Sequence, residues 1–226
     1  MGLLTGKKAF ITGAEQGIGK ESAKKLIEAG CDIYIHYFSG EEGPRELLAF
    51  AEQRGARAAC GFADLTNEDD AARCVAEAAE FLGGIDILVN NVGGIIARKW
   101  LGEIDAHFWR TVIDVNMTTM MNVTQQALPW LKAASEGASI VNLASLAGRS
   151  GGHAGSLVYS TTKGAVLTWT RSLAAELGEH GIRVNAVAPG LILGTRFHNQ
   201  HTTQASADRT IQEIPLGRAG TAEDVA

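Results

Sequence analysis

A tyrosine and a lysine stand four residues apart, at Tyr159 and Lys163, in a segment with the periodicity of a helix. Side chains at this spacing share one face of a helix and lie one turn apart. A free tyrosine titrates near pH ~10, and a neighbouring ammonium group lowers that pKa because it favours the phenolate. Tyr159 could then exchange a proton with an alcohol or carbonyl oxygen. Taken alone, the spacing is more often a half-buried tyrosine beside a solvated lysine.

A serine, Ser145, follows the apolar run Ser139–Leu143, which predicts a strand. In open α/β sheets, ligands bind at the carboxyl ends of the strands. We therefore expect the hydroxyl of Ser145 to hold a substrate oxygen beside Tyr159.

A glycine-rich turn lies between Thr12 and Gly19, after one predicted strand and before a predicted helix. Gly13 allows a tight turn, Gly17 lets the backbone approach a phosphate, and Gly19 lets the helix pack on the sheet. The N-terminus of the helix offers free N–H groups to a pyrophosphate. The flanking strand and helix favour a nucleotide site over a turn that binds nothing.

Apolar runs that are typical of strands alternate along the chain with segments of helical periodicity. The predicted strands are Lys8–Thr12, Asp32–Tyr37, Ala56–Phe62, Ile85–Asn90, Ser139–Leu143 and Arg183–Ala188. The predicted helices are Gly17–Ala29, Arg45–Arg54, Glu68–Leu82, helices across Ile104–Leu131, and Val158–Glu179. This alternation predicts an α/β fold: a single doubly wound Rossmann domain over residues 1–226, with a parallel sheet and helices on both faces.

The segment 191–214 follows the last predicted strand and is polar, with many threonine, glutamine and histidine residues. A long segment at the carboxyl end of a strand is a candidate lid over a ligand crevice. We therefore expect 191–214 to be the substrate lid.

The composition bounds the partners of the chain. A formal net charge of −5 argues against nucleic acid and against an anionic membrane, since both require a basic surface. Cys31, Cys60 and Cys74 are widely spaced and form no metal-binding pattern, so no metal site is predicted. With no signal segment or membrane-spanning run in the sequence, a cytoplasmic location is expected.

Taken in order, these motifs resemble those of the short-chain dehydrogenase/reductase family. The motifs are the TGxxxGIG turn at 12–19, Asp64 after the third strand, Asn-Asn-Val-Gly at 90–93, Asn116 in a helix, Ser145, Tyr159 with Lys163, and Pro189-Gly190 after the sixth strand. The likeness runs from about Leu4 to Ala226, and it is nearest to the group of 3-oxoacyl carrier-protein reductases and sugar dehydrogenases. It implies an NAD(P)(H)-dependent oxidoreductase that interconverts a ketone and a secondary alcohol on a small molecule.

The resemblance also implies roles for four catalytic residues. Tyr159 would be the general acid in reduction and the base in oxidation, and Lys163 would lower the pKa of the tyrosine and bind the nicotinamide ribose. Ser145 would position the substrate oxygen. Asn116 would support a chain of water molecules that relays protons to solvent, although a buried helix asparagine bonded to a neighbouring backbone group is compatible with the same residue.

Fifteen residues would bind the cofactor if the resemblance holds. They are Gly13, Gln16, Gly17, Ile18, Gly19, Tyr37, Asp64, Leu65, Asn90, Gly93, Tyr159, Lys163, Pro189, Gly190 and Ile192. For Asp64, a turn or helix-capping role is about equally compatible with the sequence.

The choice between the two nicotinamide dinucleotides depends on the end of the second strand, where NAD enzymes commonly carry an acidic residue. Tyr37 stands at that position, so no carboxylate there repels a 2′-phosphate. Gln16, however, replaces the basic residue often found before the second glycine. The sequence favours NADP(H) slightly over NAD(H).

Two further expectations follow from the family pattern. Members continue past Ala226 with a helix and a final strand, so these two elements are expected to be missing here. Members also pair through the helices that hold Asn116 and Tyr159, which implies a homodimer or homotetramer. Two alternatives to a dehydrogenase stay open: a dinucleotide-binding sensor or scaffold without activity, and an epimerase or dehydratase that retains its cofactor.

Overall fold

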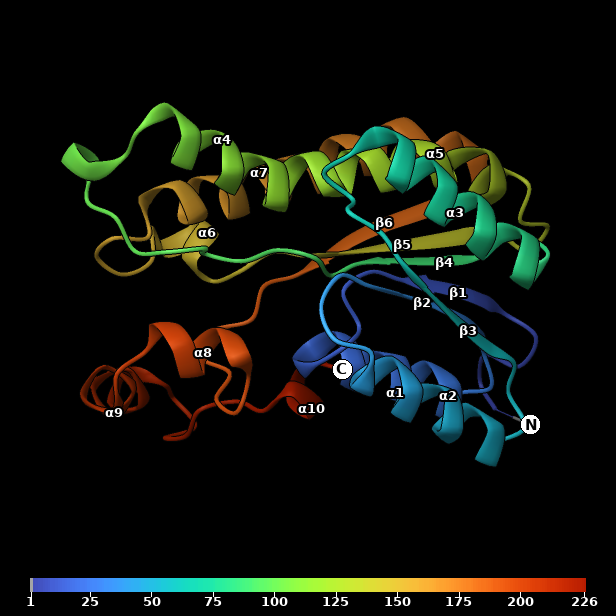
Figure 1. Cartoon of the computed structure of the whole chain (residues 1–226), viewed down its shortest axis with the longest axis horizontal. Coiled ribbons are helices and arrows are strands. Elements are labelled where there is room, and N and C mark those ends of the chain that lie inside the picture. The colour runs from blue at the N-terminus through green and yellow to red at the C-terminus, as the bar shows by residue number, and fades with distance from the viewer. Residues whose placement is uncertain (1) are drawn as a thin grey trace.

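The structure is a computed structural model that describes residues 2–226. Its centre is a sheet of six parallel strands in the order β3-β2-β1-β4-β5-β6 (Figure 1). The strands are β1 (Lys8–Ile11), β2 (Asp32–Tyr37), β3 (Ala58–Phe62), β4 (Ile87–Asn90), β5 (Ala138–Leu143) and β6 (Ile182–Val187). The predicted α/β fold with a parallel sheet is confirmed.

Helices cover both faces of the sheet (Figure 1). One face carries α1 (Gly17–Glu28) and α2 (Glu42–Gln53), and the other carries α3 (Glu68–Leu82), α5 (Thr119–Lys132) and α7 (Leu157–Leu177). This arrangement explains why the strands are apolar on both sides, since each face must pack against helices.

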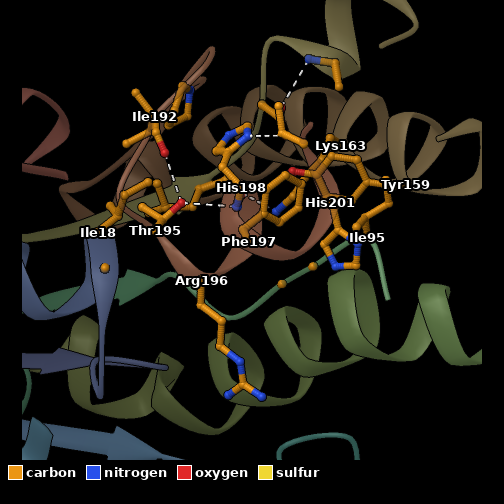
Figure 2. A pocket seen from close by; sticks show the side chains of 18 of the residues that line it. Ile18, Ile95, Tyr159, Lys163, Ile192, Thr195, Arg196, Phe197, His198 and His201 are labelled. Carbon is orange, nitrogen blue, oxygen red and sulfur yellow. Dashed lines mark hydrogen bonds between the residues drawn. The ribbon is translucent and has the colours of Figure 1, made fainter. Parts of the chain in front are cut away.

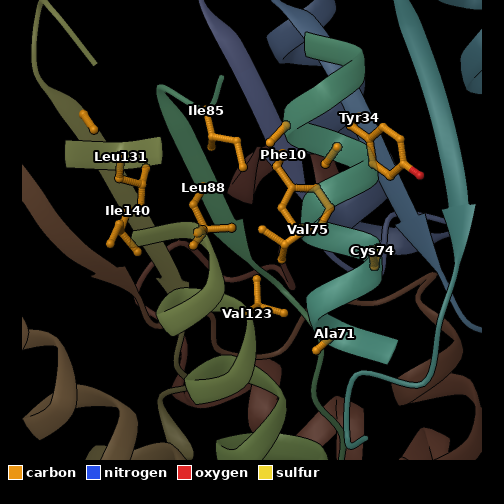
Figure 3. Close-up of a cluster of buried hydrophobic side chains, with 14 of the residues drawn as sticks. Phe10, Tyr34, Ala71, Cys74, Val75, Ile85, Leu88, Val123, Leu131 and Ile140 are labelled. Atoms are coloured by element: carbon orange, nitrogen blue, oxygen red, sulfur yellow. The ribbon is translucent and has the colours of Figure 1, made fainter. Parts of the chain in front are cut away.

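Alternate residues of the strands point into two separate cores. Phe10 and Leu88 pack with Val75 of α3 and with Val123 and Leu131 of α5 (Figure 3). On the opposite face, another buried cluster joins β1, β2 and β4 to α1 and α2; its largest members are Ile11, Ile27, Ile33, Ile35 and Leu47. Burying a large aliphatic or aromatic side chain contributes about 1.5–3 kcal/mol, so the two cores fix the sheet firmly beneath the loops at its edge.

The strand order reverses between β1 and β4, which pair in parallel with Phe10 opposite Leu88. The connections that leave these two strands therefore run to opposite faces of the sheet and leave a crevice at their carboxyl ends. The glycine turn, which follows β1, and the Asn-Asn-Val-Gly segment, which follows β4, meet at this point.

The helical region that was predicted across 104–131 is interrupted. It consists of α4 (Ala106–Ile113), a π-helical turn (Asp114–Thr118) and α5. A π turn inserts one extra residue into a helix and is frequent at functional sites. Here Asn116, whose side chain is buried, sits in its middle.

The segment 191–214 is more regular than its polar sequence indicated. It contains α8 (Arg196–His201) and α9 (Gln204–Glu213), and each begins at a threonine, Thr195 or Thr203, whose side chain caps the helix. Figure 1 shows both helices beyond the carboxyl ends of the strands, across from α4 and from the short α6 (Ala147–Ser150).

The end of the described chain lies against the first helix. The short helix α10 (Ala222–Val225) begins at Thr221 and packs on α1. Within residues 2–226, none of the helices combines the length and the apolar character that crossing a membrane would require.

Candidate active site

A cavity of about 760 Å³ opens at the carboxyl ends of the strands. Its walls are the β1–α1 turn, the loops after β2, β4, β5 and β6, the start of α7, and the segment 191–214. Ser145, Tyr159 and Lys163 all line it. The structure therefore brings together the three side chains that the sequence singled out for chemistry.

Lys163 lies beneath the tyrosine, on the same face of α7. Its ammonium nitrogen is 5.9 Å from the centroid of the Tyr159 ring. The same nitrogen donates a hydrogen bond of 2.6 Å to the carbonyl oxygen of Leu143, the last residue of β5. The sheet edge thus anchors the ammonium group, and Figure 2 shows Tyr159 and Lys163 side by side at the cavity.

The pKa values of this pair differ from the simple expectation of a lowered tyrosine pKa. Burial raises the pKa of Tyr159, and a hydrogen bond with the Ser145 side chain opposes that rise. Burial also lowers the pKa of Lys163 to about 8, because desolvation disfavours the charged form. In the protein alone the phenol is therefore protonated at neutral pH, and the amine can release its proton near physiological pH.

Ser145 stands just past the end of β5, where its hydroxyl oxygen accepts a hydrogen bond of 3.1 Å from the backbone N–H of Ala147. Because the backbone donates to its oxygen, the serine hydroxyl is left to donate its own proton elsewhere; in the protein alone the partner is the Tyr159 side chain. A phenol and a hydroxyl thus lie next to each other at the cavity.

Asn116 does not line the cavity but supports its wall. Its side-chain amide donates to the carbonyl oxygens of Gly94 at 2.8 Å and Val112 at 2.9 Å, and its oxygen accepts from the Gly94 N–H at 3.0 Å. The two bonds with Gly94 hold the loop after β4 against the π-helical turn, and the bond to Val112 of α4 fixes the side chain on its own helix. The backbone-bonding interpretation of Asn116 is therefore observed, and the water relay stays a prediction.

The glycine turn has the shape of a cradle for a backbone-bound anion. Gly13 and Gly17 adopt positive φ values of 62° and 54°, which side chains other than glycine rarely tolerate. At Gly19, a Cβ atom would lie 2.4 Å from the carbonyl oxygen of Gly13, so only glycine lets α1 approach the turn. Gln16 precedes α1 with extended backbone geometry, which leaves the first N–H groups of α1 directed at the cavity.

Gly93 leaves room where the loop after β4 passes the lysine. A Cβ atom there would be 2.7 Å from the Asn116 side-chain oxygen and 2.9 Å from the Lys163 nitrogen. The glycine turn, this gap and the cavity together fit an extended dinucleotide that runs from the turn to Lys163.

Most of the residues predicted for the cofactor line the cavity. They are Gly13, Gln16, Gly17, Ile18, Gly19, Gly93, Tyr159, Lys163, Pro189, Gly190 and Ile192.

The structure places four predicted cofactor residues outside the cavity lining. Tyr37 packs on Phe62, with ring centroids 5.9 Å apart. The residues after it, Phe38 and Ser39, line the cavity instead. Around the end of β2, the cavity lining therefore begins one to two residues after Tyr37, and the cofactor contact of Tyr37 stays a prediction.

The other three residues are held in local structure. The carboxylate of Asp64 accepts two hydrogen bonds from Thr66, at 3.0 and 2.7 Å, which is the turn role that the sequence left open. Leu65 is a core residue. Asn90 is buried and donates to Thr124 and Asn142, at 3.0 and 2.9 Å, because its side chain points below the sheet edge.

Two residues next to the glycine turn were not assigned to the site from the sequence. Asn91 lines the cavity, and its amide donates to the carbonyl oxygens of Thr12 and Gly13 at 3.0 and 2.7 Å. His36, at 1% exposure, accepts a bond of 3.1 Å from the Gly13 N–H, and its other ring nitrogen lies 3.0 Å from the Ala63 carbonyl oxygen. The sequence feature that could have pointed to His36 is its place as a histidine inside an otherwise apolar predicted strand.

His36 must be neutral to make both bonds, since only the neutral ring has one donor and one acceptor. Burial lowers its pKa to about 4, so this form persists through the physiological range. The imidazole therefore ties the glycine turn to the ends of β2 and β3.

The segment 191–214 closes one side of the cavity with aromatic and polar contacts. The Phe197 ring lies 5.6 Å from the Tyr159 ring, centroid to centroid (Figure 2). Arg98, in the loop after β4, donates to the carbonyl oxygens of His201 at 3.1 Å and Ala154 at 3.0 Å. Arg98 thereby links the segment to two loops of the sheet.

These features define a class of protein, the nicotinamide-dependent oxidoreductases. They are a doubly wound parallel sheet, a glycine turn where the strand order reverses, and a phenol beside an ammonium group. The model of the family described as short chain dehydrogenase matches residues 7–206. The chain belongs to this family. A 3-oxoacyl-[acyl-carrier-protein] reductase of Aquifex aeolicus is 36% identical over 226 residues, which are 99% of this chain and 88% of the relative.

Solved structures agree with this assignment. A short-chain dehydrogenase from Burkholderia cenocepacia in complex with NADP is 33% identical with a TM-score of 0.91, over 99% of this chain and 88% of that one. An NADH-dependent reductase, A1-R′, in complex with NAD is 30% identical with a TM-score of 0.86, over 99% of this chain and 86% of that one. Relatives of similar likeness thus bind different dinucleotides.

Proposed function

We propose that this oxidoreductase interconverts a ketone and a secondary alcohol on a small molecule, with a proton moved by Tyr159 and a hydride carried by a nicotinamide dinucleotide. The observation that carries the proposal is the convergence of Ser145, Tyr159 and Lys163 on one cavity beside the glycine turn. The dinucleotide would supply the hydride, and the protein would supply the proton and the orientation.

In the reductive direction, Tyr159 gives the proton to the carbonyl oxygen. Its raised pKa keeps the phenol in the form that can donate at neutral pH. Ser145 donates a hydrogen bond to the same oxygen and so fixes its position. When the phenolate forms, the Lys163 ammonium close to the ring favours that charge.

Lys163 also has a position from which it can recover the proton. Its pKa of about 8 lies close to neutral pH, which suits a group that must release and regain protons. Lys163 would bind the nicotinamide ribose of the dinucleotide across the gap at Gly93. The backbone of Ile192 would bind the carboxamide of the nicotinamide ring. Asn116 would hold this wall and support the proposed water relay.

The segment 191–214 would act as the substrate lid. Phe197 touches the Tyr159 ring, so a substrate that reaches the phenol must pass or displace this side chain. The pairing of two or four copies through the helices of Asn116 and Tyr159, and a cytoplasmic location, stay predictions; light scattering that shows a monomer would refute the pairing.

A spectroscopic assay tests the proposed reaction. Purified protein is incubated with NADH or NADPH and a panel of ketones that includes 3-oxoacyl thioesters, the substrate type in the names of the curated relatives. With at least one ketone, we expect the absorbance of the reduced nicotinamide to fall as NADH or NADPH is oxidised. Binding of dinucleotide with no net oxidation across the panel would favour a sensor, and conversion of substrate without net oxidation would favour an epimerase or dehydratase.

A further inference from the structure

Glu15 lies in a corner of the cavity, and the proposed reaction gives this residue no role. It lies in the β1–α1 turn and lines the cavity beside Phe38 and Ser39 of the loop after β2. One carboxylate oxygen, Oε1, accepts a hydrogen bond of 3.3 Å from the Ser39 hydroxyl. The other, Oε2, is closed off from solvent and has no hydrogen-bond partner among residues 2–226.

Oε2 is shielded from the cavity as well as from bulk water, so a ligand in the cavity meets this carboxylate through Oε1. Within the described part of the chain, the carboxylate as a whole receives only the one bond from Ser39, although its two oxygens can accept several. A carboxylate only accepts hydrogen bonds, so the group that completes this corner must bring donors such as hydroxyls.

The charges around this corner are unfavourable for a second anion. Among the described residues, those that the β1–α1 turn and the loop after β2 contribute to the lining include no basic side chain. The lysine in the first turn of α1, Lys20, is in an ion pair with Glu46. The arginine in the first turn of α2, Arg45, is in an ion pair with Glu41 at 2.6 Å. The cations nearest in sequence are thus already paired with carboxylates.

NAD(H) and NADP(H) differ at the 2′ position of the adenosine ribose, and the groups in this corner can distinguish the two. The adenosine ribose of NAD(H) carries a 2′-hydroxyl, which donates, whereas that of NADP(H) carries a 2′-phosphate, which is an anion and needs a cation such as arginine. Placing that phosphate beside Glu15 would bring like charges together, and the β1–α1 turn and the loop after β2, as the structure describes them, contribute no cation to offset them; the arginines of the cavity lining, Arg98 and Arg196, come from the loop after β4 and from the segment 191–214.

We infer that Glu15, with Ser39, binds the hydroxyls of the adenosine ribose and makes this chain selective for NAD(H). The inference rests on the proposed dinucleotide site. It reverses the slight preference for NADP(H), which considered only the end of the second strand and the residue before the second glycine. A carboxylate from the neighbouring β1–α1 turn here takes the place of the acidic residue usual at the end of that strand.

Calorimetric titration of the whole protein with NAD⁺ and with NADP⁺ tests the inference without relying on activity. We expect NAD⁺ to bind about 10- to 100-fold more tightly, the range for a charged hydrogen bond. Glu15→Gln, which keeps the shape but removes the charge, should weaken NAD⁺ by about tenfold and leave NADP⁺ unchanged or tighter. Ser39→Ala should weaken NAD⁺ by a smaller factor.

The matched control is Glu213→Gln, since Glu213 is a carboxylate that lines the same cavity from α9; this change should leave the preference intact. Titration with 5′-AMP and with adenosine 2′,5′-bisphosphate should reproduce the preference and so locate it in the adenosine half. Equal or tighter binding of NADP⁺ by the unaltered protein, or an equal loss for both dinucleotides in Glu15→Gln, would overturn the inference. An unaltered protein that binds neither dinucleotide would refute the proposed function itself.

Discussion

The two sides of the cavity are built in different ways. On the sheet side, Lys163 and Asn116 are at most 4% exposed, and each is bonded to backbone groups of a neighbouring element. On the side of the segment 191–214, the contacts include ring packing of Phe197 on Tyr159 and one bond from the exposed Arg98 to the His201 carbonyl oxygen. The difference indicates that the reacting groups are fixed by the core, while the covering segment is held by few contacts and can open at low cost.

The largest effect is expected on the fixed side, from Tyr159→Phe. This change removes the proton donor while the ring and its packing remain, so kcat/KM should fall by about 10³-fold. Steady-state kinetics measure this loss. Calorimetric titration should show that the Kd for the dinucleotide stays within about twofold of its value in the original protein. Unchanged turnover would remove Tyr159 from the mechanism.

Lys163→Met tests whether the amine acts in the reaction. The methionine fills similar volume in the buried site but cannot titrate, and kcat/KM should fall by about 10²-fold. A plot of kcat/KM against pH for the original protein should show a titration near pH 8, because the pKa of Lys163 is about 8. The same plot for Lys163→Met should lack this titration. A profile that keeps this group would show that another residue titrates there.

His36 extends the fixed side to the glycine turn and makes its stability depend on pH. Its pKa is about 4 in the folded protein and about 6.5 when unfolded. Between these values the unfolded chain binds more protons, so the free energy of unfolding should fall by about 3 kcal/mol as the pH drops from about 6.5 to 4. Urea unfolding at several pH values measures this slope.

A matched pair of variants isolates that contribution. His36→Asn, which keeps a side-chain acceptor, should be less stable at pH 7 but should lose less stability on acidification. His107→Gln, at an exposed position of α4, should keep the slope of the original protein. An unaltered slope in His36→Asn would assign the acid sensitivity to other groups.

The smallest effect is expected from loosening the covering segment. Arg98→Met removes the bonds to the His201 and Ala154 carbonyl oxygens, and KM should rise by about 3- to 10-fold with little change in kcat. Arg110→Met, on the exposed surface of α4, is the control and should change neither. A large loss of kcat in Arg98→Met would mean that the two sides of the cavity are not independent.

The sequence predicted the sheet and its helices well because each element carries its own periodicity. Every predicted strand is present, with ends shifted by no more than a few residues, as at Ala56–Phe62 against Ala58–Phe62. The spacing of Tyr159 and Lys163 on one helix could likewise be read directly. These features depend on local pattern, which a single sequence records.

Other parts of the site depend on contacts that no local pattern records. Phe38 and Ser39 line the cavity and Tyr37 does not, although β2 ends at Tyr37 as the sequence indicated, because the path of the loop after β2 is set by its packing in the fold. The raised pKa of Tyr159 comes from burial, which the spacing to Lys163 does not reveal. The pairing of Glu15 with Ser39 joins two loops that only the folded crevice brings together.

The π-helical turn at Asp114–Thr118 has a consequence for how the chain can vary in length. Deleting one residue there would restore an ordinary helix and remove the bulge while the flanking helices keep their orientation, because a π turn accommodates one extra residue. The local backbone that places Asn116 against Gly94 would then be lost, although every residue type needed for the site would still be encoded. A single-codon deletion in a solvent loop would be tolerated, whereas the same event here would disable the protein, so this stretch should keep a constant length among functional descendants.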